Sequence, residues 1–329
     1  MIRFVLVSLL CLAASLAQAA GFQRIEIQVG GALSPPLKGA VWYPCAKPPG
    51  EMKIGPYVLT VTEDCPMAGG KLPLVVISHG RGGDFLGHHD TAEALADAGF
   101  VAVAINHPGD TARDMSRTDD RSIFLERPAD IKRTIDFMLG AWSDSARIDP
   151  SRIGFFGFSR GGYTGLVDIG AELSSSKALR LCEGNDGSIC DQVRKGTPPE
   201  LVHDPRIKAA VIADPLGIFF AAESFRNVSV PVQLWGSERG GDGVTPESVR
   251  DIAGWLPMKP DFHVQPNSQH FDFLAPCSAD LAKMAPTICA DGHRFDRAAF
   301  HKEFNASVLA FFREHLTDAE TRLLGGKQP

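Results

Sequence analysis

The residues around Ser159 constrain the fold of this chain most strongly. An apolar run over residues 153–156 leads into Gly157-Phe158-Ser159-Arg160-Gly161, and a segment that can begin a helix follows from Tyr163. This is a Gly-x-Ser-x-Gly turn between a buried strand and a helix, the sequence form of a nucleophile elbow. Glycines two positions before and after the serine let strand and helix pass closely. The pattern predicts that the hydroxyl of Ser159 points into a cleft.

Other apolar runs predict an α/β fold with a mostly parallel central sheet. Continuous apolar segments at residues 72–78 and 100–105 flank a helical pattern at 90–98, which is the spacing of a βαβ unit. Such strands are apolar throughout because helices cover both faces of a parallel sheet. Two shorter alternating segments, 23–29 and 39–43, are expected as antiparallel edge strands.

The remaining pattern continues the same alternation. We expect, in chain order, a helix over 128–142, the strand and helix around Ser159, strands at 207–213, 230–235 and 261–265, and a final helix over 296–316. The stretch of about 170–205 is too long for a plain connection, so it is expected to form a small cap or substrate-facing insertion.

The first twenty residues resemble a secretory signal peptide. Arg3 precedes an apolar run over residues 4–16, and Ala17-Gln18-Ala19-Ala20 is a small-residue cleavage site. The alternative is a membrane anchor, which is less favoured because the run is shorter than the ~20 residues that a spanning helix needs. Residues 21–329 are then expected to form a single domain that is exported to the periplasm or the medium and has no spanning segment of its own.

Six cysteines remain after this leader, and an even number in an exported chain indicates disulfides. They fall into three local couples, so the expected pairs are Cys45 with Cys65, Cys182 with Cys190, and Cys277 with Cys289. Zinc binding is the competing interpretation. It is poorly supported because the chain has no CxxC and no paired Cys/His spacing.

Charge argues against nucleic acid as a partner. The formal net charge is −6, and residues of both signs are interspersed, so no basic face is indicated. The glycines after residue 79 could suggest a phosphate-binding loop, but the chain contains neither GxxxxGK[ST] nor GxGxxG.

A serine nucleophile needs a histidine base, and the histidine needs a carboxylate to orient it. In hydrolases with a nucleophile elbow these follow in the order serine, acid, histidine. His270 is the favoured base because it lies in a polar turn directly after the last strand. The other late histidines fall in a strand, in the Cys289 loop or on the final helix: His263, His293, His301 and His315.

Two carboxylates follow strands and can serve as the acid. Asp214 comes directly after the strand at 207–213, whereas Glu238, with Asp242 behind it, follows the strand at 230–235. Both would lie at the carboxyl ends of neighbouring strands, so periodicity does not choose between them. Ester hydrolysis also needs amide donors for an oxyanion, and the expected donors are the backbone N–H groups of Arg160 and Arg81. His79 is expected to brace the loop that carries Arg81.

Taken together, five segments resemble the platelet-activating-factor acetylhydrolase type of α/β-hydrolase and the related bacterial dienelactone-hydrolase-like proteins. The resemblance runs from about residue 72 to 274 and rests on Leu74–Gly80, Asp97–Val103, Gly157–Gly162, Ala210–Pro215 and Ser268–Phe273. It implies an α/β-hydrolase fold and favours Asp214 as the acid, with Glu238 in reserve. Dienelactone hydrolases proper use a cysteine where this chain has Ser159.

The resemblance implies a serine esterase that forms an acyl-enzyme without metal or organic cofactor, and the leader implies that this esterase is exported. The expected catalytic residues are Ser159, Asp214 and His270, and the expected substrates are short-acyl or lipid-type esters. Two alternatives stay open: a hydrolase-fold protein that binds a ligand without turnover, and an amidase or peptidase on the same fold.

Overall fold

The computed structural model describes residues 19–28, 35–183, 188–196 and 200–317. Their strands form one ten-stranded sheet in the order β10-β9-β8-β7-β5-β6-β2-β1-β4-β3. The strand bounds are β1 Ala19–Ile27, β2 Leu37–Cys45, β3 Gly50–Ile54, β4 Tyr57–Glu63, β5 Leu72–Ser78, β6 Val101–Ile105, β7 Ile148–Phe158, β8 Ile207–Ala213, β9 Val232–Ser237 and β10 Asp261–Gln265.

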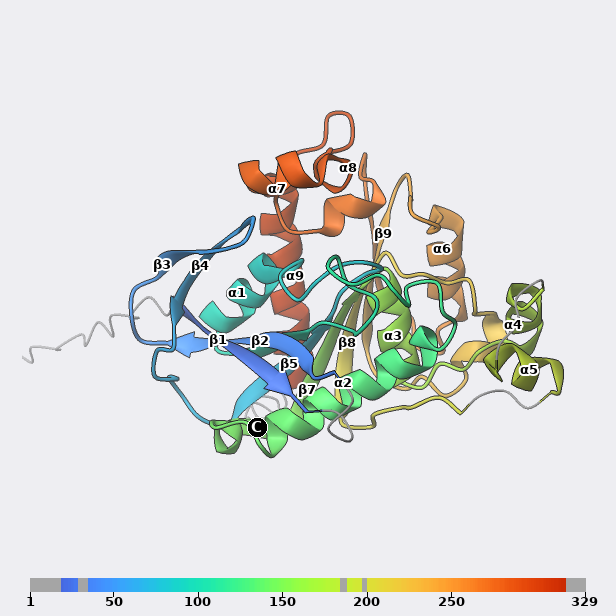
Figure 1. The fold of residues 1–329 in the computed structure, drawn as a ribbon, viewed down its shortest axis with the longest axis horizontal. Coiled ribbons are helices and arrows are strands. Elements are labelled where there is room, and N and C mark those ends of the chain that lie inside the picture. The colour runs from blue at the N-terminus through green and yellow to red at the C-terminus, as the bar shows by residue number, and fades with distance from the viewer. Residues whose placement is uncertain (1–18, 29–34, 184–187, 197–199, 318–329) are drawn as a thin grey trace, which may run out of the picture.

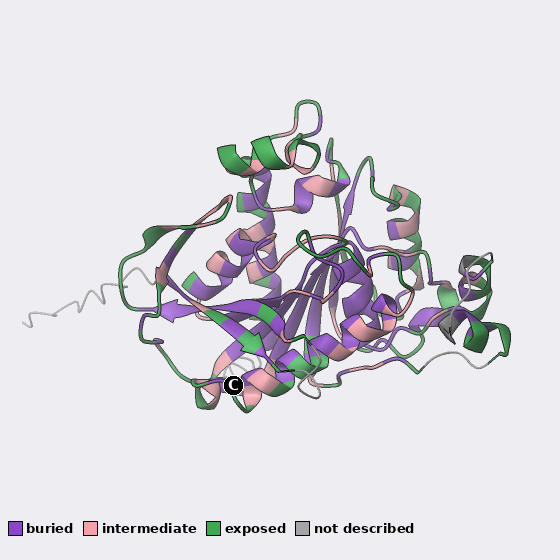
Figure 2. Cartoon of the chain, viewed as in Figure 1, coloured by how far each residue is buried: buried purple, intermediate pink, exposed green. Residues whose placement is uncertain are grey.

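Helices cover both faces of this sheet (Figure 1). Their bounds are α1 His89–Asp97, α2 Ile123–Leu139, α3 Arg160–Asp168, α4 Ser175–Leu181, α5 Ser188–Arg194, α6 Pro246–Trp255, α7 Ala279–Met284, α8 Pro286–Cys289 and α9 Arg297–Leu316. Two buried apolar clusters result, one between the sheet and α2, α3 and α6, the other between the sheet and α1 and α9. Figure 2 shows the strands between these layers almost wholly buried. The chain therefore has the expected α/β-hydrolase fold.

The parallel part of the sheet contains β5 to β10, and its central strands lie where the sequence predicts them. β5, β8 and β10 match the expected ranges, β6 begins one residue later than expected, and β9 is shifted two residues toward the C-terminus from the expected 230–235. Neighbouring strands from β6 through β5, β7, β8 and β9 to β10 all pair parallel. Their carboxyl ends consequently meet along one edge of the sheet, where Ser78, Phe158 and Ala213 end β5, β7 and β8.

The expectation that the first two strands lie at the edge is wrong. β2 pairs antiparallel with β6 on one side and with β1 on the other, and β1 also pairs parallel with β4. The hairpin β3–β4, which the sequence analysis missed, extends the sheet beyond them. Both hairpin strands are partly exposed and carry charged residues, so their apolar signal is weak.

Helix α2 begins at Ile123, five residues before the expected start at Pro128. Pro128 therefore lies inside the helix, where it has no amide hydrogen to donate to the preceding turn. The carbonyl oxygen of Phe124, four residues earlier, loses its helical partner as a result. It accepts a hydrogen bond from the hydroxyl of Tyr163 instead, at 3.3 Å. This contact with α3 compensates for the proline.

The three expected disulfides are present. Cys45–Cys65 joins the end of β2 to the chain after β4, Cys182–Cys190 joins the ends of α4 and α5, and Cys277–Cys289 closes the segment that carries α7 and α8.

The described residues contain no helix long and apolar enough to cross a membrane. Residues 1–18 of the expected leader lie outside the described part, and its last two residues, Ala19 and Ala20, belong to β1.

The insertion between α3 and β8 forms α4 and α5 around the small cluster Ala178, Cys182, Cys190 and Val193. It leaves the fold at the end of α3 and rejoins it before β8, where the amide of Asp204 donates to the carbonyl of Asp168 at 2.8 Å. Both points lie at the end of the sheet opposite to Ser159, and Figure 1 shows α4 and α5 at the periphery. This placement does not support the expectation of a small cap or substrate-facing insertion.

Asp168, the last residue of α3, is a buried carboxylate without a hydrogen-bond partner among the described residues. Its exposed fraction is 1%, and neither carboxylate oxygen is paired. Burial raises the pKa of Asp168 well above its usual value, and the nearby carboxylates of Asp204 and Asp130 raise it further. The carboxyl of Asp168 therefore ionises at a lower pH in the unfolded chain than in the folded protein. Because of this difference, Asp168 makes folding less favourable as the pH rises.

We therefore expect Asp168→Asn to stabilise the protein increasingly above about pH 4. The wild type should lose about 1.4 kcal/mol of unfolding free energy per pH unit relative to the variant, until the folded carboxyl ionises. Urea unfolding between pH 4.5 and 8 measures this difference. Asp149→Asn is the control: hydrogen bonds from Ser151 lower the pKa of Asp149, so this carboxyl is ionised in the folded and the unfolded chain throughout this range, and its replacement should change the unfolding free energy by an amount that does not vary with pH. A difference for Asp168→Asn that does not change with pH would contradict the prediction.

Candidate active site

Ser159 occupies a strained turn between β7 and α3. Its φ and ψ are 56° and −118°, a conformation that non-glycine residues rarely adopt. Two flanking glycines leave the space that the turn needs: a Cβ atom at Gly161 would collide with the carbonyl oxygen of Ser78, and one at Gly157 would collide with that of Gly161. The crossing of strand and helix predicted from the sequence is therefore present.

Ser159, His270 and Asp214 form one hydrogen-bonded chain. The distance from His270 Nε2 to Ser159 Oγ is 2.9 Å, and that from His270 Nδ1 to Asp214 Oδ2 is 2.6 Å. All three residues are buried, with exposed fractions of 4%, 1% and 0%. The ring of Phe158 stacks on the imidazole at 4.6 Å. Both distances suit transfer of the hydroxyl proton to the imidazole.

Asp214 is held by Ser237, the last residue of β9. The amide of Ser237 donates to Asp214 Oδ1 at 2.8 Å, and the hydroxyl of Ser237 donates to Oδ2 at 2.9 Å. These bonds fix the edge of the carboxylate that faces His270. A carboxylate oriented in this way can hold the imidazole in the tautomer whose Nε2 accepts the serine proton.

The structure does not bring Glu238, the alternative candidate for the acid, to His270. Glu238 is exposed, and its Oε2 accepts a hydrogen bond from the amide of Asn267 at 2.6 Å. Two of the other late histidines have different partners. His263 stacks on Trp235 and pairs with Asp261, and His301 pairs with Asp90.

The two residues expected to supply oxyanion-binding amides lie on the two segments that meet at Ser159. Arg160 is the first residue of α3, where amides have no partner within the helix and carry partial positive charge. Arg81 lies in the loop after β5. The preceding Gly80 packs so closely that a Cβ atom there would lie 3.1 Å from Cβ of Ser159.

His79 connects this loop to the loop after β6. Its Nδ1 lies 2.7 Å from the carbonyl oxygen of Gly80, and its Nε2 accepts from the amide of His107 at 3.2 Å. Burial, and then the positive charge of Arg127, holds the pKa of His79 well below its usual value. A neutral imidazole at this position braces the loop, as the sequence analysis expected.

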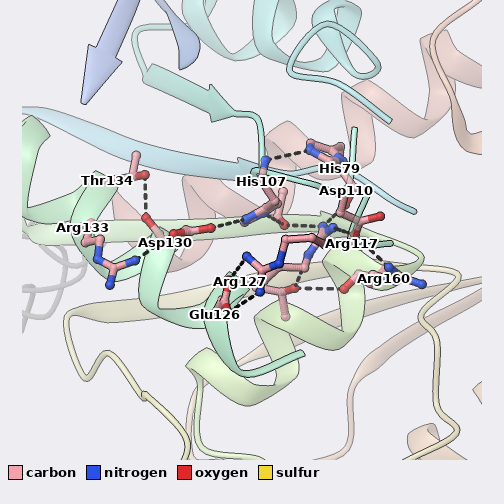
Figure 3. Close-up of polar contacts among 12 residues, drawn as sticks. His79, His107, Asp110, Arg117, Glu126, Arg127, Asp130, Arg133, Thr134 and Arg160 are labelled. Carbon is pink, nitrogen blue, oxygen red and sulfur yellow. Dashed lines mark hydrogen bonds and ion pairs between the residues drawn. The ribbon is translucent and has the colours of Figure 1, made fainter. Parts of the chain in front are cut away.

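A second arrangement of serine, histidine and aspartate lies beneath the loop, and the sequence analysis missed it. His107 Nε2 is 3.0 Å from Ser78 Oγ. His107 Nδ1 is 3.0 Å from Asp130 Oδ2, and Figure 3 shows these two side chains facing each other. Ser78 has no exposed surface and also accepts from Arg127 Nη2 at 3.2 Å. Because substrate has no access to this hydroxyl, the arrangement is structural. Its sequence signal is the polar stretch Asn106–Asp110 at the carboxyl end of β6.

The turn that carries His270 has its own support. Asp272 is fully buried; its Oδ2 accepts from the amide of Gln269 at 2.7 Å, and its Oδ1 accepts from Arg297 Nη2 at 3.1 Å. The same guanidinium donates to the carbonyl of Ile288 at 3.0 Å, inside the segment closed by Cys277–Cys289. Arg297 therefore ties the histidine turn to the disulfide-closed segment.

A cavity of about 520 Å³ is lined by the loops after β5 and β6, by β1 and β2 and by the β3–β4 hairpin. Asp84, Phe85 and Leu86 line it, but Ser159, His270 and Asp214 do not. Its charged lining residues are of both signs, so it selects no charged ligand class: Arg24, Glu26, Lys38, Asp84, Arg113 and Asp114. Among the described residues, no group of three or more His, Cys, Asp or Glu side chains is arranged to hold a metal ion.

Comparison with known proteins bears on the fold. The chain matches no protein-family model and no curated protein sequence. Among solved structures, it is similar to a ferulic acid esterase from Streptomyces cinnamoneus, with a TM-score of 0.63 and 19% sequence identity. The match covers 92% of this chain and 91% of that one. At this identity the similarity shows a shared fold.

We expect Arg297→Met to destabilise the protein strongly, because it leaves Asp272 buried and unpaired. Loss of one partner of a buried ion pair costs about 3–5 kcal/mol. Urea unfolding at pH 7 measures the loss, and the double variant Asp272→Asn/Arg297→Met should recover part of it. A single variant within about 0.5 kcal/mol of wild type, the range of ordinary surface substitutions, would show that this pair does not support the turn.

Proposed function

We propose that this protein is a serine hydrolase of carboxylic esters. The observation that carries the proposal is the hydrogen-bonded chain from Ser159 through His270 to Asp214, with the serine on a strained turn at the start of α3. A serine hydroxyl becomes a competent nucleophile only next to a base, and the base needs an orienting acid. The fold shared with a ferulic acid esterase is compatible with this chemistry.

In the proposed reaction Ser159 Oγ attacks the ester carbonyl carbon while its proton passes to His270 Nε2. Asp214 stabilises the imidazolium through the Nδ1 proton. The amides of Arg81 and Arg160 donate to the oxyanion of the tetrahedral intermediate. His270 then protonates the leaving alcohol, and an acyl-enzyme remains. Water attacks this acyl group with His270 again as base, which releases the acid and restores the serine.

Short-acyl and lipid-type esters are the substrates that the sequence resemblance favours. A feruloyl ester belongs in the same panel, because the similar fold is that of a ferulic acid esterase. Amides of the same acyl groups test the amidase or peptidase alternative. A protein that binds a ligand without turnover would process none of these substrates.

Export of this hydrolase to the periplasm or medium is also part of the proposal. The expected leader over residues 1–20 supports it, and so do the three disulfides, since such bonds persist in oxidising compartments. Mass spectrometry of the protein from the extracellular or periplasmic fraction would identify the mature N-terminus. An intact leader on protein that stays inside the cell would contradict export.

We expect Ser159→Ala and Asp214→Asn to lose ester hydrolysis while Glu238→Gln retains it. In the hydrolases that define this triad, the aspartate-to-asparagine change alone lowers kcat about 10⁴-fold, because the histidine is then held in the wrong tautomer. Turnover of p-nitrophenyl acetate and butyrate by matched, folded samples measures the effect. Glu238→Gln is the matched control, because it is the other carboxylate that follows a strand and it does not contact His270.

Labelling by a fluorophosphonate gives a second measurement that is independent of substrate choice. Wild type should be labelled at Ser159, and Ser159→Ala should not. Wild-type turnover equal to that of Ser159→Ala on every ester, together with absent labelling, would overturn the proposed function in favour of ligand binding. Loss of activity in Glu238→Gln but not in Asp214→Asn would overturn the assignment of the acid.

A further inference from the structure

We infer that Asp110 is the positioning residue for both oxyanion-binding amides. The inference rests on the proposed function and extends it to a residue that does not contact substrate. Asp110 lies after β6 and is fully buried. Figure 3 shows it among polar side chains, close to Arg127 and Arg160.

One carboxylate reaches both segments that carry the amides. Asp110 Oδ1 accepts from the amide of Gly82, the residue after Arg81, at 3.2 Å. Asp110 Oδ2 accepts from Nη1 of Arg160 at 2.9 Å. The loop after β5 and the first turn of α3 are therefore connected through the two oxygens of one side chain.

The loop around Arg81 depends on such external contacts. Gly82 has a φ of 59°, a left-handed conformation that is open mainly to glycine. Because glycine has no side chain to restrict its backbone, it does not fix this conformation by itself. Arg127 holds the chain before Arg81 by donating to the carbonyl of His79. Asp110 holds the chain after it at the amide of Gly82. The peptide of Arg81 lies between these two fixed points.

The guanidinium of Arg160 is also held by several contacts. Its Nη1 donates to Asp110 Oδ2 and, at 2.8 Å, to the carbonyl of Thr118. Its guanidinium carbon lies 4.9 Å above the ring of Phe124, and only 6% of the side chain is exposed. A side chain fixed at its far end restricts rotation of the residue whose amide begins α3.

The charges show that Asp110 is ionised in this position. Burial by itself would raise the pKa of Asp110, but Arg127 and Arg160 outweigh burial and bring the pKa to about 2. Arg127 Nη1 donates to Oδ2 at 2.6 Å, and the hydroxyl of Thr118 donates to Oδ1 at 2.7 Å. The carboxylate thus accepts four hydrogen bonds from other residues, and its orientation is fixed at both oxygens.

The test compares Asp110→Ala with wild type in the mature protein. Oxyanion donors act on the transition state more than on bound substrate, so kcat should fall about 100-fold while KM changes less than about threefold. A trifluoromethyl ketone, whose adduct with the serine carries the oxyanion, should bind about 100-fold more weakly. A smaller folded fraction would by itself lower apparent kcat at unchanged KM, but it would not weaken inhibitor binding, so the inhibitor separates a positioning role from a folding role. Unchanged kcat and unchanged inhibitor binding would overturn the inference.

The matched control is Asp204→Ala. Asp204 is also a buried aspartate paired with an arginine, Arg206, but it lies before β8, at the opposite end of the sheet. This variant should lose stability and keep kcat. If Asp110→Ala does not fold, Arg160→Gln replaces it, because Asp110 then keeps Arg127 as a counter-ion. Arg160→Gln should lower kcat at least about tenfold with KM nearly unchanged, and wild-type kcat in this variant would overturn the inference.

Amide hydrogen exchange measured by NMR separates this inference from the proposed function, since it needs no turnover. The Gly82 amide should exchange at least about tenfold faster in Asp110→Ala than in wild type, whereas Asp204→Ala should leave it unchanged. Faster exchange in a protein that hydrolyses no ester would support Asp110 as the residue that orders the loop and would overturn only the esterase proposal. Unchanged exchange at Gly82 would overturn the role of Asp110 even in an active esterase.

Discussion

The strained turn at Ser159 is the constraint on which the rest of the site depends. Its amide donates to the carbonyl of Ala213 at 2.9 Å, and its carbonyl accepts from the amide of Leu216 at 3.0 Å. The turn is thereby bonded on both sides to the chain that carries Asp214. Positive φ at Ser159 and glycine at positions 157 and 161 are needed for α3 to start directly above β5 and β7. The serine, the helix terminus and the aspartate are consequently placed by one backbone crossing.

The sequence predicts those parts of the fold that have a strong local signal. Buried parallel strands such as β5 and β8 are continuous apolar runs, and a serine between glycines marks the elbow. Periodicity could not choose between Asp214 and Glu238, because both follow strands and their side-chain directions depend on the loops beyond. Asp214 is turned toward His270 by bonds from Ser237, a tertiary contact. The β3–β4 hairpin was missed since its alternation is half polar.

The buried polar network beneath the loop could not be predicted for a related reason. Arg127 and Asp130 lie three positions apart on α2, which in sequence is typical of an exposed ion pair. In the structure Arg127 has no exposed surface, and its guanidinium contacts β5, the loop after β6 and α3. Burying such charges adds little stability compared with well-packed apolar side chains. Their presence is better explained by the position that they give to neighbouring backbone.

Ser159, the turn of His270 and the loop of Arg81 are each held by a different set of contacts. This separation follows from the topology of the sheet. Backbone bonds to the chain after β8 hold Ser159, Asp272 with Arg297 holds the His270 turn, and Asp110 with Arg127 holds the loop of Arg81. The two ion pairs join residues 17 and 25 positions apart in the chain, and they share no residue. The elements that converge at the carboxyl ends of β5, β7 and β8 come from different regions of the chain, so no single local motif could align them. Buried carboxylate–arginine pairs supply the directional, charge-assisted bonds that this alignment requires.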